Sequence, residues 1–240
     1  MDPFFNHIFP TLPNNGSLTQ SFLSWEKSSI EAMKLTPPQS DIWACWQSAL
    51  GLCVTRKEHR LPHFAKARAN LAIKGHELAT RRSGGTVVPQ GHGILNITQL
   101  SLHTGPRNIG GSYMRFCENM QARFKALGFE TEIGPVTGSY CDGDYNLILD
   151  GKKLAGTSQR WVKGPDKAFI TLNHAVILVT ENGQAATQRV NDFHAIADGP
   201  DLAKPPYDTA SSISLWDSVQ NSTGLDKPVF FERVYQSLKT

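Results

Sequence analysis

The chain has 240 residues, with 24 Lys and Arg against 21 Asp and Glu and a formal net charge of +3. Its 40% hydrophobic content is typical of a folded globular protein, and so small a positive surplus argues against nucleic-acid binding. The four cysteines are too few for a disulfide scaffold and none has C-x-x-C spacing, so no metal site is expected.

The N-terminus and the apolar runs argue against the common targeting segments. The first basic residue is Lys27, whereas a secretory signal needs a positive start followed by an apolar stretch. The longest clean apolar run, from Ala175 to Val179, is far too short to span a bilayer. We therefore expect a cytoplasmic protein without a membrane partner, in which all four thiols stay reduced.

The first half of the chain begins with an arm rich in Pro, Asn and Gly over residues 1–16, which is expected to be irregular. Ser17 can cap a helix, with Gln20 at the capping-box position. The elements expected next are a helix from Ser17 to Pro37, two core strands within 41–55, a helix over 64–74 that ends at Gly75, and a strand over 94–102.

The second half continues the alternation of helices and strands. The expected elements are a helix over 111–127, a strand over 145–149, a returning strand over 152–156, a β-branched apolar run over 168–180, a loop over 198–212 and a short amphipathic helix over 229–238. The pattern predicts an α/β or α+β protein with a mixed β-sheet core and flanking helices, forming one domain over 17–240.

Three segments carry candidate chemistry, and the first is Arg81-Arg82-Ser83-Gly84-Gly85. Paired glycines allow a ligand to approach the backbone closely, and their amides can bind a carboxylate, a carbonyl or a phosphate. The same residues are compatible with a tight turn at a charged edge. The absence of a following G-K-[ST] excludes a P-loop.

The second segment places Cys141 in a polar loop between Gly138 and Gly143. The other cysteines lie in apolar or amphipathic elements, where a thiol usually acts as a small hydrophobic group. A nucleophilic cysteine must be reachable and needs positive charge close by. Cys141 alone of the four meets the first condition, and it is either a nucleophile or an incidental loop cysteine.

The third segment is a hairpin turned by Asp150-Gly151. Lys152 and Lys153 point to opposite faces of the returning strand, so one can be solvated while the other faces a site. Ala155 and Gly156 are small and leave room for a ligand. Through this hairpin Lys153 can approach Cys141, although a polar edge strand protected by lysines is the alternative.

These segments resemble the signatures of the lipoate–protein ligase and octanoyltransferase family, which shares its catalytic fold with biotin–protein ligases. The run from Arg82-Ser83-Gly84-Gly85 to Gly93-Ile94-Leu95-Asn96 is similar to one family motif, and Gly151-Lys152-Lys153-Leu154-Ala155-Gly156 to its lysine motif. The resemblance is strongest over 50–179. It implies the biotin/lipoyl ligase fold and these substrate-binding residues: Arg82, Ser83, Gly84, Gly85, Asn96, Leu154, Ala155 and Gly156.

One branch of the family fits better than the others. The segment Gly138-Ser139-Tyr140-Cys141-Asp142-Gly143-Asp144-Tyr145-Asn146-Leu147 is similar to the cysteine motif of octanoyl-[glycine-cleavage H protein] transferases. The His-Asp pair that ATP-dependent ligases carry after their glycines is missing. The resemblance implies that Cys141 is the acyl-carrying nucleophile and Lys153 the site lysine. His174 falls near the position of a family histidine. We expect it either to support the residues that contact the substrate or to be purely structural.

The resemblance implies acyl transfer without ATP or another cofactor. An octanoyl or lipoyl group would pass from a donor, glycine-cleavage H protein or acyl carrier protein, through Cys141 to a lysine on lipoyl domains of 2-oxoacid dehydrogenases. The acyl chain would need an apolar tunnel walled by Val87, Val88, Ile94, Leu95 and Ala155. The alternatives are an ATP- and Mg-dependent lipoate, octanoate or biotin ligase, and a non-catalytic module that binds carrier proteins.

Overall fold

The computed structural model describes residues 18–199 and 204–239. Its larger sheet has six strands in the order β1-β5-β9-β8-β7-β6, and every neighbouring pair is antiparallel. The strands are β1 (Ile42–Trp46), β5 (Ile94–His103), β6 (Glu132–Gly134), β7 (Asn146–Leu149), β8 (Lys152–Lys163) and β9 (Phe169–Leu178). A smaller sheet has the order β3-β2-β4, made by β2 (Gly51–Val54), β3 (Glu77–Thr80) and β4 (Val88–Gln90).

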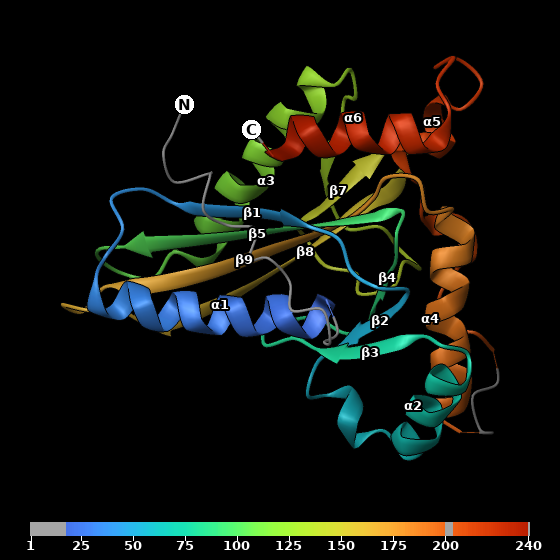
Figure 1. Ribbon diagram of the computed structural model, residues 1–240, viewed down its shortest axis with the longest axis horizontal. Helices are drawn as coiled ribbons and strands as arrows, with labels where there is room; N and C mark the ends of the chain where they lie inside the picture. Colours follow the sequence, from blue (N-terminus) through green and yellow to red (C-terminus); the bar gives the residue numbers. More distant parts are fainter. Residues whose placement is uncertain (1–17, 200–203, 240) are drawn as a thin grey trace.

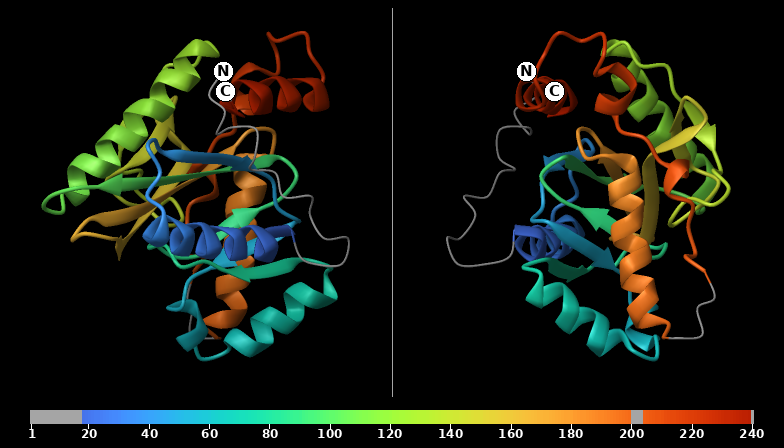
Figure 2. Two further views of the ribbon diagram at one scale, coloured as in Figure 1. Left: turned by 60° about the vertical axis from the view of Figure 1, so that its left-hand side comes forward. Right: turned by 90° about the vertical axis from the view of Figure 1, so that its right-hand side faces the viewer.

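Helices cover both faces of the larger sheet (Figure 1). They are α1 (Leu18–Leu35), α2 (Phe64–Ile73), α3 (Ile109–Ala126), α4 (Gly183–Ala197), α5 (Leu215–Val219) and α6 (Lys227–Lys239). Helices α3 and α6 lie on one face and α1 on the other, while α2 and α4 pack beside the smaller sheet (Figure 2). Among the described residues, no helix has the length and apolar character needed to cross a membrane.

The side chains of strand β9 alternate between the two faces of the larger sheet and so belong to different hydrophobic clusters. Ala175 and Ile177 pack into the cluster formed with α3 and α6, whereas Leu172 packs against α1. Val176 and Leu178 face the cluster of the smaller sheet and α4. Successive side chains of a strand point to opposite faces. The even-numbered residues of β9 therefore face α1 and the smaller sheet, on the side of the larger sheet opposite α3 and α6.

Two polar rows cross the middle of this sheet on opposite faces. Thr98, His174 and Ser158 are register partners on β5, β9 and β8, and we call them the histidine row. The next residues along, Gln99, Asn173 and Gln159, are likewise in register and form the amide row. The histidine row contacts α1 through Glu26, and the amide row contacts α3 through Ser112. Buried polar groups are tolerated when they are hydrogen-bonded, as these are.

A β-bulge lies at the start of β8. Leu147 of β7 pairs with Ala155, but Ile148 pairs with Lys153, so Leu154 is an extra residue on β8. A bulge shifts the alternation of side chains by one position. Leu154 and Ala155 both pack towards α3, while Lys153 shares a face with Gly156 and Ser158.

Most predicted elements are confirmed, including the mixed arrangement of sheets and helices. The two strands within 41–55 are present but belong to different sheets. The returning strand was expected to end at Gly156 and instead continues to Lys163. Helix α4 was missed because its buried face mixes small and polar residues with only two large apolar ones, Val190 and Phe193. The arm over 1–16 and the cap at Ser17 lie outside the described residues, and the single domain over 17–240 stays a prediction.

Candidate active site

The Cys141 loop is held in an uncommon backbone conformation. Cys141 has φ +47°, a left-handed value that non-glycine residues seldom adopt. The neighbouring Asp142 fixes the loop, because its Oδ1 accepts hydrogen bonds from the N–H groups of Val136 and Gly143, both at 2.9 Å, and from Asn146 Nδ2 at 2.7 Å. The loop therefore presents the thiol from a backbone that three donors restrain.

Lys153 lies directly beneath this loop. Its side chain is 0% exposed, and Nζ donates to the carbonyl oxygens of Tyr140 at 2.5 Å and Cys141 at 2.9 Å. Its Nζ is also 4.8 Å from the centre of the Tyr140 ring. A Cβ on Gly156 would come within 3.0 Å of Lys153 Cε, so glycine at that position leaves room for the lysine stem. The bulge and the glycine together explain how a lysine is accommodated inside the protein.

The glycine loop closes over the thiol from the other side. Arg81 Nη2 donates to the carbonyls of Gly84 at 3.0 Å and Thr86 at 2.6 Å, and lies 3.8 Å from Cys141 Sγ. The Thr86 N–H donates to the same sulfur at 3.1 Å. Gly85 has φ +92°, and a Cβ there would sit 2.6 Å from Sγ. Glycine is thus required both by the backbone conformation and by the closeness of the sulfur.

The charges around Cys141 favour its thiolate. Burial alone would raise the pKa of Cys141, but the charges of Arg81 and Lys153 and the Thr86 N–H outweigh it, so the pKa lies below its ordinary value. Burial lowers the pKa of Lys153 to about 8, against the opposing charges of Cys141 and Asp142. The surroundings therefore favour the thiolate form of Cys141, and a pKa of about 8 leaves Lys153 mainly an ammonium at neutral pH.

The remaining cysteines have a different environment, since all three are buried and none forms a disulfide. Burial raises the pKa of Cys117 to about 12 and also raises the pKa of Cys53. Cys45 and Cys117 belong to the core cluster under α3. The sequence-based distinction between one loop cysteine and three packing cysteines agrees with these surroundings.

A narrow cavity leads from Cys141 between the larger sheet and the smaller one. Its wall includes Leu23 of α1, Trp46, Val88 and Val176, together with the polar side chains of Ser158 and His174. Val88 was among the expected tunnel walls. Leu95 and Ala155 were also expected there, but they pack into the core under α3 on the opposite face. The sequence did not reveal that strands of two different sheets would enclose the space.

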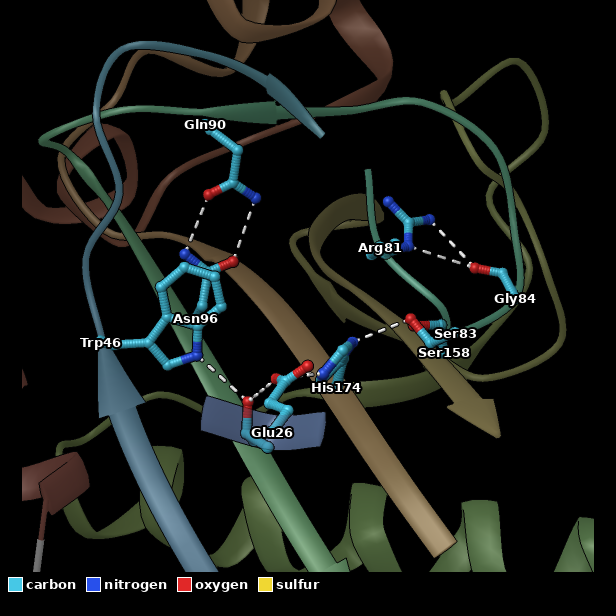
Figure 3. Close-up of polar contacts among 10 residues, drawn as sticks. Glu26, Trp46, Arg81, Ser83, Gly84, Gln90, Asn96, Ser158 and His174 are labelled. Atoms are coloured by element: carbon cyan, nitrogen blue, oxygen red, sulfur yellow. Dashed lines mark hydrogen bonds and ion pairs between the residues drawn. The ribbon is translucent and has the colours of Figure 1, made fainter. Parts of the chain in front are cut away.

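The other predicted binding residues divide into two groups. Asn96 lines the cavity and exchanges two hydrogen bonds with Gln90, at 2.9 and 3.0 Å. Ser83 is buried and contacts His174, so the loop and β9 are joined (Figure 3). Arg82, by contrast, is exposed, and the side chain of Leu154 lies in the core under α3. Their roles in substrate binding stay predictions.

Two participants were not identified from the sequence. Arg81, rather than its neighbour Arg82, reaches the sulfur, and two adjacent arginines in a loop give no signal to separate them. Glu26 of α1 is 3% exposed and contacts His174 Nε2 at 2.6 Å. It stands within the apolar stripe of Phe22, Ile30 and Met33, and a lone charge inside such a stripe is the signal that could have revealed it.

A basic depression lies on the outer side of the glycine loop. Its lining includes the side chains of Arg56, Lys57, Arg82 and Arg160, together with Gly84 and Gly85. Burial, and then the positive charges of Arg82 and Arg56, lower the pKa of Arg160. Among the described residues these four cations form no ion pair with a carboxylate, and no cluster of His, Cys, Asp and Glu is placed to hold a metal ion.

The sequence assigns this fold and this loop arrangement to a known family of domains. Residues 33–234 match the lipoyl protein ligase A/B catalytic domain, and the chain belongs to that family. It is similar to an octanoyl-[GcvH]:protein N-octanoyltransferase of Exiguobacterium sibiricum, with 32% identity over 76% of this chain and 65% of that protein. A protein of the same name from Kyrpidia tusciae is 33% identical over 51% of this chain and 44% of that protein.

Known structures support the fold. A bipartite lipoate protein ligase from Thermoplasma acidophilum aligns with a TM-score of 0.63 and 16% identity, over 92% of this chain and 79% of that one. The chain spans 44% of the transferase from Kyrpidia tusciae and 65% of the one from Exiguobacterium sibiricum. The family and the fold are thus established.

Proposed function

We propose that this protein transfers an octanoyl group from a donor protein to a lysine of an acceptor protein through a thioester on Cys141. The observation that carries the proposal is the setting of the Cys141 sulfur, which accepts the Thr86 N–H at 3.1 Å and lies 3.8 Å from Arg81 Nη2. These donors and the charge of the buried Lys153 lower the pKa of Cys141 and so favour its thiolate. The names of the matching transferases point to the same reaction.

In the first step the Cys141 thiolate attacks the carbonyl carbon of the donor thioester or amide. The new C–S bond forms and the C–S or C–N bond to the donor breaks; a thiol leaves as its thiolate, whereas a leaving amine takes up a proton from water. Negative charge passes from the sulfur to the carbonyl oxygen, where the Thr86 N–H and the Arg81 guanidinium stand ready to stabilise it. Lys153 holds the loop through two carbonyls and supplies positive charge without touching the substrate.

In the second step the amine of an acceptor lysine attacks the thioester and releases the thiolate. The octanoyl chain would lie in the cavity lined by Leu23, Val88 and Val176. We place the donor as an octanoylated glycine-cleavage H protein, because both matching transferases carry GcvH in their names. The acceptors would be lipoyl domains, one of which accompanies the similar ligase of Thermoplasma acidophilum.

Intact-protein mass spectrometry tests the proposal. After incubation with octanoylated H protein and no ATP, the wild type is expected to gain one octanoyl group on Cys141, and addition of a lipoyl domain should remove it. Cys141→Ser should lose transfer, whereas Cys117→Ser should keep it. Modification that requires ATP and free octanoate would instead support the ligase alternative. Tight binding of a lipoyl domain without any transfer would support the binding module.

A further inference from the structure

The histidine row continues into an ordered chain of hydrogen bonds (Figure 3). Ser158 Oγ donates to Ser83 Oγ at 3.0 Å, Ser83 Oγ lies 2.8 Å from His174 Nδ1, and His174 Nε2 lies 2.6 Å from Glu26 Oε1. A carboxylate only accepts, so Nε2 carries the proton and Nδ1 is free to accept the Ser83 hydroxyl. Every donor in the chain therefore points in the same direction, from Ser158 towards Glu26.

The Glu26 end of this hydrogen-bond chain is held by further hydrogen bonds. The Glu26 carboxylate also accepts the Thr98 hydroxyl at 2.8 Å, and the Thr98 oxygen accepts the Trp46 indole N–H at 3.1 Å. Glu26, His174 and Ser83 are 3%, 6% and 4% exposed. A buried carboxylate is costly unless it is paired, and this one has both a hydroxyl and an imidazole partner.

The Ser158 end of the hydrogen-bond chain lies at the proposed acyl cavity. Ser158 and His174 line that cavity together with Cys141. Ser83 stands two residues before Gly85, whose α-carbon faces the sulfur closely. Glu26 precedes the stretch 33–234 that matches the family, so α1 adds a component that the family match does not include.

The second step of the proposed reaction needs a proton acceptor. An amine that attacks a thioester becomes positively charged, and the amide forms only after it loses a proton. Lys153 is poorly suited to this task, because its Nζ donates to two carbonyls and an ammonium has no lone pair. With the imidazole proton on Nε2, His174 Nδ1 is reached through two hydroxyls and has the free lone pair that the step requires.

We propose that Ser158, Ser83, His174 and Glu26 form a proton relay that takes up the proton of the attacking amine; the inference rests on the proposed function. The N–C bond forms and the C–S bond breaks, leaving the electron pair on Cys141 Sγ. One proton passes from the amine to Ser158 Oγ, the Ser158 proton to Ser83, and the Ser83 proton to His174 Nδ1. Glu26 stabilises the imidazolium, and the proton returns along the chain to water when the amide leaves.

The test measures the two steps separately. Acyl-enzyme is prepared with a small octanoyl thioester, whose thiolate leaving group needs no proton from the relay, and is isolated. Its decay on mixing with a lipoyl domain is followed by mass. Ser83→Ala and Glu26→Gln are expected to acquire the octanoyl group at near wild-type rates but to transfer it about 10²-fold more slowly. Ser112→Ala is the matched control, since it removes an equally buried hydroxyl from the end of the amide row and should change neither step.

A second readout separates proton transfer from mere positioning. Isolated acyl-enzyme is treated with butylamine, which resembles a lysine side chain, or with hydroxylamine, whose adduct loses its proton readily to water. Loss of the relay should slow the butylamine reaction about 10²-fold and the hydroxylamine reaction only a few-fold. Equal losses with both amines, or unchanged transfer in both variants, overturn the relay alone. Absence of any octanoyl adduct on wild-type Cys141 overturns the proposed function and the relay together.

Discussion

The histidine row and the amide row lie back to back on the same three strands, one residue apart, yet their chemistry differs. In the amide row Gln159 Nε2 donates to Asn173 Oδ1 at 2.7 Å and to Ser112 at 2.9 Å, and Asn173 Nδ2 donates to Gln99 at 2.8 Å. These amides are neutral, and Gln99 Nε2 also donates to Asp41 Oδ2 at 2.6 Å. An amide does not take up a proton, so the amide row joins strands and α3 without exchanging protons. The histidine row contains an imidazole, paired with the Glu26 carboxylate, and lies at the Cys141 cavity, which gives it a group that can gain and lose charge.

A buried polar row therefore indicates chemistry when it contains an ionisable side chain and is connected by hydrogen bonds to a cavity. Substitutions on the Cys141 side of the sheet should then change reaction rates more than stability, and substitutions on the α3 side the reverse. Four measurements test that division.

The largest effect is expected from Lys153→Met. The variant removes the buried ammonium beneath Cys141, and we expect acylation of Cys141 to fall about 10³-fold. Because the Lys153 charge lowers the pKa of Cys141, its loss should also raise that pKa, so iodoacetamide should alkylate the variant thiol only at higher pH. Rates of alkylation across pH give the measurement.

Cys117 provides an internal reference in the same alkylation experiment. Burial raises its pKa to about 12, so it should stay unmodified in folded protein at pH 8 in both forms. An unchanged alkylation profile for Cys141 after Lys153→Met would show that the lysine has no electrostatic role.

The next effect concerns Gly85→Ala. The added Cβ would fall 2.6 Å from Cys141 Sγ, so the sulfur or the loop must move, and a displacement of this order costs about 10²-fold in rate. Gly75→Ala is the control, because Gly75 also has positive φ, at +70°, but nothing lies within 4 Å of its Cβ. Both variants should lose about 1 kcal/mol of unfolding free energy in urea, and only Gly85→Ala should lose acylation. Similar acylation in the two variants would contradict the close approach.

A smaller effect is expected from Asn173→Ala in the amide row. The substitution leaves Gln99 Oε1 and one Gln159 N–H without their partner, which should cost about 2 kcal/mol of unfolding free energy. Acylation and transfer per folded molecule should stay at wild-type values. A selective loss of transfer would show that the two rows are not functionally separate.

The smallest effect is expected from Arg82→Ala. Arg82 is exposed beside the basic depression, so its charge should help an acidic carrier protein to approach and contribute little once bound. We expect the KM for the carrier to rise a few-fold at low salt and the difference to vanish at high salt, with kcat unchanged. A salt-independent loss of kcat would instead place Arg82 at the reacting atoms.

The sequence predicted the parts of the site that depend on local chemistry. A cysteine in a polar glycine-flanked loop and a lysine after an Asp-Gly turn could both be recognised from neighbouring residues, and the structure brings Lys153 Nζ to within 2.9 Å of the Cys141 carbonyl oxygen. The contact between Glu26 and His174 joins residues 148 positions apart, and only the packing of α1 against β9 creates it. The choice between Arg81 and Arg82 likewise depends on the path of the loop over Cys141.

The extra residue at Leu154 determines to which face of β8 the Lys153 side chain points. Between the Leu149–Lys152 pair and the Leu147–Ala155 pair, β8 contains one residue more than β7. With Leu154 kept, a regular ladder continued from the Leu147–Ala155 pair would place Lys153 opposite Leu149, whose side chain lies in the apolar core under α3. The bulge instead keeps Lys153 opposite Ile148 and turned towards Cys141, so an insertion that shifts this register by one residue should be more harmful than a conservative change of Leu154.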